Sequence, residues 1–222
     1  LEQAVNSFIE QDYPDKELII VNDGCTGKHA LRFGAMKLAN THENIKYYSR
    51  LNRGQSAAQN FGIAASTGEL LCTLDDDDLL FPTNSISERV KLYEHDPGLE
   101  FIWTSAREFG ASDKIVHGRK KDFLEEWRRD DIYINTVMWR KSILEKIGGY
   151  WFDEDLTSNE DWDFKVRCLL NCKSDFADFV STKHRVHPGM RSSLHRSRGE
   201  LSLNESKYRE KLKAKYKELS NG

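Results

Sequence analysis

The sequence predicts an α/β fold with a mostly parallel, doubly wound sheet and helices on both of its faces. Short apolar runs that are typical of buried strands alternate with segments that have the apolar spacing of helices. Turn signals such as Asn22-Asp23-Gly24 separate the two kinds of segment. Alternation of this kind is typical of βαβ units, which pack helices against a parallel sheet.

The elements expected in the first half follow this alternation. Leu1–Gln11 has the apolar spacing of an amphipathic helix, and Tyr13-Pro14 ends it. After it we expect three strands and two helices: strands at Glu17–Val21, Ile45–Tyr48 and Leu70–Leu74, and helices at Lys28–Ala39 and Ser56–Ala65.

The second half is less regular. Here we expect helices at Pro82–His95, Ser142–Ile147 and Trp162–Leu170, a hairpin of Phe101–Glu108 with Lys114–Lys121, and a charged tail helix at Leu203–Leu219. We find no repeat and no low-complexity linker, so residues 1–195 are interpreted as one domain followed by a tail at 196–222. Within the domain, residues 1–105 form the regular half and residues 106–195 the less regular half.

Composition limits the classes of partner and compartment. The 222 residues carry 33 Lys and Arg against 36 Asp and Glu, a net charge of −3, which argues against nucleic acid as the main partner. The apolar runs are too short for a transmembrane segment. Four cysteines lack the spacing of a zinc site, so free thiols in a reducing compartment are expected. We place the protein in the cytoplasm, or peripherally at the membrane.

Four consecutive aspartates, Asp75 to Asp78, follow the apolar run Leu70–Leu74. Aspartate is a poor strand former, and the carboxyl ends of strands line the ligand crevice of open α/β sheets. Two carboxylates about 4 Å apart repel by about 4 kcal/mol at an effective dielectric constant near 20. A divalent cation with oxygen ligands reverses that repulsion. A solvated acidic loop is the alternative interpretation of the aspartates alone.

Six segments, in order along the chain, resemble family 2 glycosyltransferases. Each segment of this chain is followed in parentheses by the family pattern that it resembles. The segments are Gln11–Thr26 (QxYPxxEIIVVDDGST), Asn52–Ile63 (NxGxSxARNxGI), Thr67–Asp78 (xGEYIxFLDxDD, containing the DxD motif), Thr136–Tyr150 (TVMFRRxxLEKIGGF), Glu160–Arg167 (EDWDFxxR) and Arg185–His187 (YRVH). A single DxD motif would be weak support, whereas the ordered set covers residues 1 to about 195.

The resemblance implies a glycosyltransferase-A-type fold and a nucleotide-diphosphate sugar donor, expected to be a UDP-sugar. It further implies Mn²⁺ or Mg²⁺ as cofactor, a saccharide or glycoconjugate acceptor, and inversion at the anomeric carbon. The regular half is expected to bind the nucleotide sugar and the less regular half the acceptor. The donor-binding residues that it implies are Asp23, Asn52, Gly54, Asn60, Asp75 and Asp76, with Asp23 near the base and Asp75 near the ribose.

The resemblance also assigns the metal and the general base. Asp77, Asp75 and His187 are the implied metal ligands. Asp161 matches the aspartate that removes the acceptor proton, and Glu160 is its possible substitute. Capping of the helix by Ser158 or Asn159, with acidic residues in the first turn, is the alternative interpretation of this pair.

Further basic and aromatic residues are weaker candidates. Arg185, Arg191 and His195 are candidates for closing over the phosphates, with a solvated basic loop as the alternative. Tryptophans at positions 103, 127, 139, 151 and 162 are candidates for a sugar-stacking platform, although the default for most is the core.

The chain also departs from the family pattern. Family members begin with a strand before the segment that corresponds to Leu1–Gln11, and we expect that strand's place to lie between Leu18–Val21 and Leu70–Leu74. Gln59 replaces an arginine, and Asn22 replaces an aspartate. The QxxRW pattern of processive synthases is not visible.

These observations favour a non-processive glycosyltransferase that acts in polysaccharide or glycoconjugate synthesis. A sugar nucleotidyltransferase is the first alternative, because it also combines an α/β sheet with metal-binding carboxylates. A non-catalytic nucleotide-sugar-binding module of a larger assembly is the second.

Overall fold

The computed structural model describes residues 1–25, 31–120, 132–156 and 159–188. Contacts divide the chain into two units, Leu1–Arg185 and Val186–Gly222, and only residues 186–188 of the second are described. The predicted tail helix, Trp127, Ser158, Arg191 and His195 therefore lie outside the described residues. Among the described helices, none combines the length and the apolar composition needed to cross a membrane.

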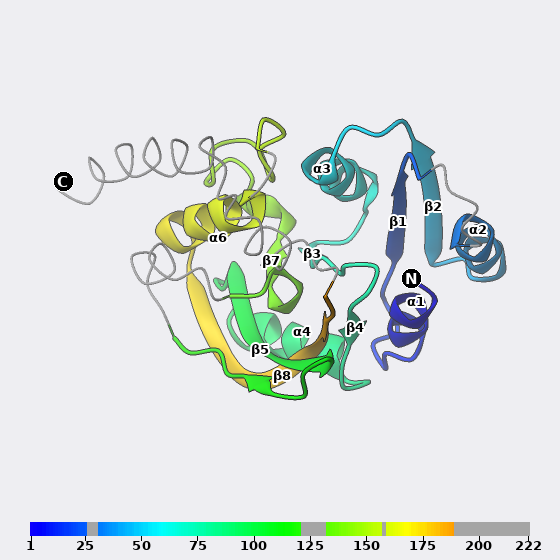
Figure 1. Ribbon diagram of the computed structural model, residues 1–222. Helices are drawn as coiled ribbons and strands as arrows, with labels where there is room; N and C mark the ends of the chain where they lie inside the picture. The colour runs from blue at the N-terminus through cyan, green and yellow to red at the C-terminus, as the bar shows by residue number, and fades with distance from the viewer. Residues whose placement is uncertain (26–30, 121–131, 157–158, 189–222) are drawn as a thin grey trace. The chain divides into compact units, whose positions relative to one another are not determined.

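The first part of the chain forms a parallel βαβ unit (Figure 1). Its elements are α1 (Glu2–Ile9), β1 (Leu18–Asp23), α2 (Leu31–Thr41), β2 (Ile45–Arg50) and α3 (Gln55–Ala65). β1 and β2 pair in parallel, from Leu18 opposite Ile45 to Asp23 opposite Arg50. Helix α3 packs on β1 at Gly62, where an added Cβ would meet a Val21 methyl group at 3.4 Å. These elements confirm the predicted alternation.

A second sheet occupies the rest of the first unit. Its strands are β3 (Leu70–Leu71), β4 (Leu79–Leu80), β5 (Phe101–Gly110), β6 (Ile115–Val116), β7 (Met138–Arg140) and β8 (Ser174–Val186). They lie in the order β3-β7-β5-β8-β4, with β6 paired to β5. β5 and β8 are its longest strands and run side by side along a pronounced curve (Figure 1). This part of the chain also contains two helices and two 3₁₀ turns: α4 (Ser85–His95), α6 (Glu160–Asn171), η1 (Ile134–Thr136) and η2 (Lys141–Ile143).

Strand direction in this sheet differs from the mostly parallel sheet that we predicted. The pairs β3–β7, β4–β8, β5–β6 and β5–β7 are all antiparallel. Parallel neighbours need a long crossover, whereas antiparallel neighbours can be joined by a short turn. A short turn of this kind joins the predicted β5–β6 hairpin, whereas β3–β7, β4–β8 and β5–β7 pair strands that are far apart in the sequence. The strand expected at Leu70–Leu74 is limited to Leu70–Leu71, and the helix expected at Ser142–Ile147 is replaced by η2 and a turn.

The strand pairing is compatible with the expectation that the first strand of the family would lie between β1 and β3. In the described residues β1 pairs with β2, and β3 pairs with β7 in the other sheet. Direct pairing of β1 with β3, which would have overturned the expected strand order, is absent from the part of the chain that the structure describes. The order itself stays a prediction.

The two faces of the second sheet bury different helices. Phe101 on β5 and Trp139 on β7 join a cluster with Phe164 of α6, whose ring centroid lies 4.9 Å from that of Trp139. Their neighbours Ile102 and Met138 point the other way, into a cluster with residues of α1 and α4. Alternate strand residues face opposite sides of a sheet, so α6 and α4 cover opposite faces. Helices on both faces were predicted and are confirmed.

Three of the tryptophans that were candidates for a sugar-stacking platform lie in the core instead. Trp103, Trp139 and Trp162 are each at most 1% exposed. Fully buried rings have no open face for a sugar, so these three residues stabilise the core.

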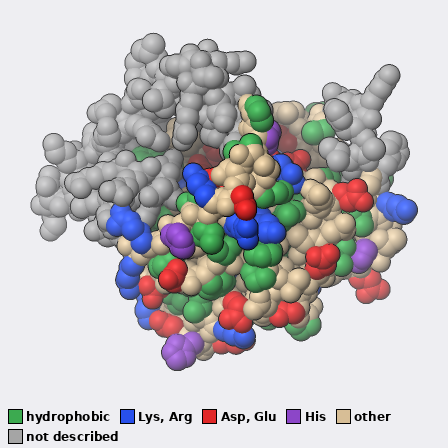
Figure 2. Space-filling view, turned by 60° about the horizontal axis from the view of Figure 1, so that its bottom comes forward, with side chains coloured by type: hydrophobic (Ala, Val, Ile, Leu, Met, Phe, Trp, Pro, Cys, Tyr) green, Lys and Arg blue, Asp and Glu red, His purple; other side chains and the backbone are tan. Residues whose placement is uncertain are grey.

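The face of the molecule in Figure 2 carries acidic, basic and hydrophobic side chains interspersed with one another. This mixture agrees with the small net charge of −3.

A buried arginine of α6 holds this helix to the loop that precedes it. Arg167 Nε lies 2.8 Å from Asp163 Oδ2, and both side chains are almost fully buried. The same guanidinium donates to the carbonyl oxygens of Ile147, Tyr150 and Trp151. A guanidinium that is removed from water needs such partners, because desolvation of an unpaired charge is costly.

We expect Arg167→Met to lower the free energy of unfolding by about 3–5 kcal/mol, because it leaves the Asp163 carboxylate buried without its cation. The measurement is urea unfolding monitored by tryptophan fluorescence. Lys91→Met is the matched control: its pair with Glu88 is exposed, so its loss should leave the free energy of unfolding almost unchanged. Equal losses in the two variants would contradict this prediction.

Candidate active site

The four aspartates lie in the loop between β3 and β4, and the fold gives them different environments. Asp75 and Asp77 are half-buried, Asp76 is exposed, and Asp78 is 1% exposed. The Asp78 N–H donates to the Asp75 carbonyl at 3.1 Å, which closes a turn. The aspartate run is therefore not a uniformly solvated loop.

Asp78 is an anchor of this loop. Its Oδ1 accepts a hydrogen bond from the Arg185 backbone N–H at 2.7 Å, and its Oδ2 lies 3.0 Å from His184 Nδ1. The amide of Asn135 also donates to Oδ2. Burial alone would lower the pKa of His184, but the neighbouring Asp78 carboxylate raises it. Because these contacts engage both oxygens of Asp78, Asp75 and Asp77 are the better candidates for binding an ion.

Arg185 holds the same loop through its side chain. Its Nε donates to the carbonyl oxygen of Asp77 at 2.8 Å, and its Nη2 donates to Gln3 Oε1 at 2.6 Å. The guanidinium also lies 4.2 Å from the ring centroid of Phe109. The side chain of Arg185, a candidate phosphate-binding residue, is thus hydrogen-bonded to the backbone of the loop of residues 75–78, which we call the acidic loop.

Negative charge gathers at Asp75. Burial and, to a smaller extent, the carboxylates of Asp78, Asp77 and Asp161 together raise the pKa of Asp75 to about 7, against the opposing effect of His184. Asp161 belongs to the first turn of α6, so this turn lies within electrostatic range of Asp75. The roles of these residues as metal ligands and general base stay predictions.

The start of α6 presents its acidic residues differently. Asn159 precedes the helix with a φ of 61°, and its side chain makes no capping hydrogen bond, so the predicted side-chain cap at Asn159 is not formed. Glu160 is 5% exposed, whereas the Asp161 side chain is 36% exposed. Asp161 Oδ2 lies 3.5 Å from the Nζ of Lys165, a buried cation one turn along the helix. Asp161 is thus the more accessible of the two carboxylates.

Asp23 organises the loop before α3. Its carboxylate accepts the backbone N–H groups of Arg53 at 3.1 Å and Gly54 at 2.8 Å, and Arg50 Nε lies 3.5 Å away. Gly24 adopts a φ of +83°, and an added Cβ there would approach Asn52 N to 2.7 Å. The predicted donor residues Asp23, Asn52 and Gly54 therefore lie together at the end of β1.

Asn60 makes other contacts. Its Nδ2 donates to the carbonyl of Phe152 at 2.8 Å and to Glu154 Oε1 at 3.1 Å, and its Oδ1 accepts the Phe152 N–H at 3.0 Å. These bonds engage both ends of the amide. The structure supports a role for Asn60 in holding the loop at Phe152.

The predicted metal site includes one residue that the contacts above do not involve. His187 belongs to the second unit, so its assignment as a metal ligand stays a prediction. In the part of the chain that the structure describes, no group of three or more His, Cys, Asp or Glu side chains is arranged to hold a metal ion.

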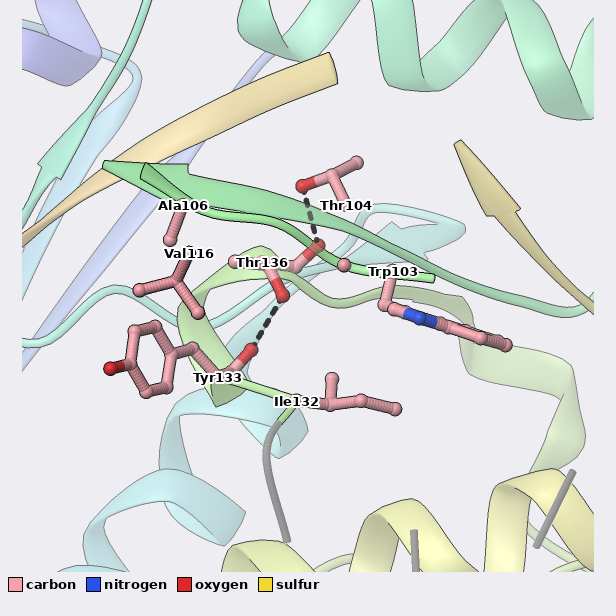
Figure 3. A pocket seen from close by; sticks show the side chains of 8 residues that line it. Trp103, Thr104, Ala106, Val116, Ile132, Tyr133 and Thr136 are labelled. Atoms are coloured by element: carbon pink, nitrogen blue, oxygen red, sulfur yellow. Dashed lines mark hydrogen bonds between the residues drawn. The ribbon is translucent and has the colours of Figure 1, made fainter. Parts of the chain in front are cut away.

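A narrow pocket lies beside the Asp78 anchor, between β5 and η1 (Figure 3). The ring of Tyr133 lines it and packs against the His184 ring in a tilted arrangement, with centroids 4.7 Å apart. Trp103 also lines it, but Trp103 is 1% exposed and its indole N–H donates to the Arg119 carbonyl. The pocket is therefore part of the packed support of the site and offers no open stacking face.

Sequence reasoning missed Asn135 and His184, the partners of Asp78. They lie 57 and 106 residues from it along the chain. No local spacing signals a contact between such distant positions.

We expect Asp78→Ala to lower the free energy of unfolding by about 2 kcal/mol or more, because it leaves buried donors of Arg185 and Asn135 unpaired. Urea unfolding measures the change. Asp76→Ala is the control, because Asp76 is exposed and its loss should cost less than about 0.5 kcal/mol. A control as destabilised as Asp78→Ala would remove the anchor role from Asp78.

Comparisons with known proteins agree with this architecture. The family model described as glycosyl transferase family 2 matches residues 1–156. An uncharacterized glycosyltransferase from Rickettsia typhi is 30% identical over 201 residues, which are 84% of this chain and 60% of the relative.

Solved structures show a similar fold. TarS from S. aureus in complex with UDP-GlcNAc has a TM-score of 0.71 at 18% identity, covering 86% of this chain and 56% of TarS. The mannosyltransferase PcManGT from Pyrobaculum calidifontis, in complex with GDP-Man and Mn²⁺, has a TM-score of 0.64 at 18% identity, covering 89% of this chain and 56% of PcManGT. The chain thus spans little more than half the length of these proteins. It has a glycosyltransferase-A-type fold and belongs to glycosyl transferase family 2.

Proposed function

We propose that this chain carries the catalytic centre of a non-processive glycosyltransferase, which moves a sugar from a nucleotide-diphosphate sugar to a saccharide or glycoconjugate. The observation that carries the proposal is the turn that Asp78 and Arg185 hold in place and that presents Asp75 and Asp77. The accessible Asp161 in the first turn of α6 supports it, because its charge acts on Asp75. Family membership supports sugar transfer. A UDP-sugar is the proposed donor, because TarS has the same fold and was solved with UDP-GlcNAc.

A divalent cation, Mn²⁺ or Mg²⁺, fits the chemistry of the acidic loop. Asp75 and Asp77 offer hard oxygen ligands, and their neighbourhood has excess negative charge. Two carboxylates leave most positions around such an ion open for phosphate oxygens, in keeping with the lack of a larger ligand group among the described residues. Mn²⁺ accompanies GDP-Man in PcManGT, which supports this cofactor. When bound, the cation would neutralise charge on the departing diphosphate.

The end of β1 is the proposed site of the nucleoside. Asp23, Asn52 and Gly54 lie together there. The Asp23 carboxylate holds the loop before α3 by accepting the backbone N–H groups of residues 53 and 54. In the proposed arrangement Asp75 contacts the ribose, and the exposed Asp76 borders the donor. Hydrogen bonds that order residues 53 and 54 before the donor arrives would lower the entropic cost of binding.

Asp161 is the proposed general base for an inverting displacement. It removes the proton from the acceptor hydroxyl as that oxygen bonds to the anomeric carbon and the bond from this carbon to the diphosphate breaks. Lys165 Nζ lies 3.5 Å from Asp161 Oδ2 and holds this carboxylate one turn from its own position on the helix. Glu160 is 5% exposed and is therefore the weaker candidate.

The remaining aspects of the proposal concern the acceptor and the cellular setting. The absence of the QxxRW pattern supports transfer of single sugars. We propose action in polysaccharide or glycoconjugate synthesis, in the cytoplasm or peripherally at the membrane.

The product of the reaction tests the proposed function. A glycosyltransferase releases free UDP from UDP-GlcNAc or UDP-glucose, to an acceptor or slowly to water. A nucleotidyltransferase releases pyrophosphate from a nucleoside triphosphate, and a binding module releases neither. Chromatography of nucleotides after incubation with Mn²⁺ separates these outcomes, and pyrophosphate release would contradict the proposal.

We expect Mn²⁺ to increase the affinity for UDP at least 10-fold over a chelated sample, because the diphosphate and the acidic loop otherwise repel each other. Asp77→Ala should abolish this metal dependence, as measured by titration calorimetry. Asp15→Ala, an exposed aspartate before β1, should retain it. Full metal-assisted binding by Asp77→Ala would show that the ligand assignment is wrong.

We expect Asp161→Asn to reduce UDP release by about 10²-fold or more, which is the scale of general-base catalysis. Affinity for UDP-GlcNAc should change less than about 2-fold, because the amide keeps the size of the side chain. Glu160→Gln is the comparison. If Glu160→Gln loses turnover while Asp161→Asn keeps it, the base is Glu160.

A further inference from the structure

The loop from Ile147 to Glu154 connects η2 to the segment before α6, and two helices hold it from opposite sides. One is α3, which follows the predicted nucleotide loop. The other is α6, which carries Asp161 in its first turn. The loop is therefore in a position to fix the distance between the donor-binding part and the general base.

On the α3 side, Asn60 pairs with the backbone of Phe152 as a neighbouring strand would. It donates to the Phe152 carbonyl at 2.8 Å and accepts the Phe152 N–H at 3.0 Å. Glu154 adds an outer contact, because it accepts from Asn60 at 3.1 Å and lies 3.5 Å from Arg53 Nη2. Arg53 in turn donates its backbone N–H to Asp23. The loop is thus joined to the end of β1 through Arg53.

On the α6 side, contact is made by packing and by Arg167. Phe152 is 1% exposed, and its ring centroid lies 5.0 Å from that of Phe164, three residues after Asp161. Arg167 donates to the carbonyls of Ile147, Tyr150 and Trp151. A shift of Phe152 would therefore displace its packing partner on α6, because close-packed interiors transmit displacements.

We propose that Asn60 is a positioning residue for the general base: through Phe152 it sets the position of the first turn of α6, and hence of Asp161. This inference rests on the proposed function of Asp161. It replaces the predicted contact of Asn60 with the nucleotide sugar, because the amide already bonds to Phe152 and Glu154. Misplacement of a catalytic group by about 1 Å can cost about 10²-fold in rate.

Asn60→Leu tests the proposal, because it keeps the approximate size of the side chain and removes all three bonds. We expect the kcat for UDP release from UDP-GlcNAc with Mn²⁺ to fall about 10-fold or more. The dissociation constant of UDP should change less than about 2-fold, because no donor contact is lost. A nucleotide contact of Asn60 would instead weaken UDP binding and leave kcat nearly unchanged, and this result would overturn the proposal.

Two controls separate positioning from general loss of stability. Val90→Ala shortens a buried side chain of α4 in the other core cluster, so it should lower the melting temperature without changing kcat at a temperature well below unfolding. Glu154→Gln keeps an oxygen that accepts from Asn60 and removes only the charge of the exposed pair with Arg53, so it should lower kcat much less than Asn60→Leu does. If Val90→Ala loses kcat to the same extent as Asn60→Leu, the effect is stability alone and the proposal fails.

Amide hydrogen exchange provides a readout that does not depend on turnover. In Asn60→Leu, exchange should accelerate about 10-fold or more at residues 150–156 and at Asp163, whose N–H closes the first turn of α6 on the Asn159 carbonyl, while exchange in α4 stays unchanged. Unaltered exchange at Asp163 would overturn the positioning role. If Asp161→Asn keeps full turnover, the proposed base is wrong, and the exchange result still decides whether Asn60 orders α6.

Discussion

The buried carboxylate of Asp78 is the contact on which the arrangement of the acidic loop depends. It joins β4, which follows the aspartates, to the end of β8 through the Arg185 backbone N–H and the ring of His184. The Arg185 side chain returns the contact by bonding to the carbonyl of Asp77. Loop backbone and strand therefore hold each other by reciprocal bonds, and Asp75 and Asp77 are presented on a fixed turn.

A second constraint places α6 relative to that turn. Arg167 and Asp163 form a buried pair within the helix, and the remaining donors of Arg167 bind the carbonyls of the preceding loop. The ring of Phe164 packs against Trp139 of the sheet. These contacts are buried, and together they fix α6 against the sheet and the loop. The accessible carboxylate of Asp161 therefore projects from a helix whose other side is held in the core.

Much of the first half was predictable because its signals are local. The strands β1 and β2, the helix α3 and the glycine turns follow from apolar spacing and turn residues, and the ordered motifs predicted the family. The antiparallel direction of the second sheet was not predictable, because β3 and β4 are only two residues long and their pairing is set by distant strands. The partners of Asp78 were missed for the same reason.

The roles within the run of four aspartates illustrate this limit most clearly. Identical side chains carry no sequence signal that separates an anchor from an ion ligand, and burial and hydrogen-bond partners separate them instead. The cation of Arg185 is directed at a backbone carbonyl of the loop, so it orders the turn through Asp77 without pairing with the Asp75 carboxylate. Carboxylates that remain close together raise the energy of the native state when nothing is bound. A ligand that relieves this repulsion then stabilises the fold as it binds, and local electrostatic strain of this kind is what distinguishes a binding site from the well-paired charges of the core.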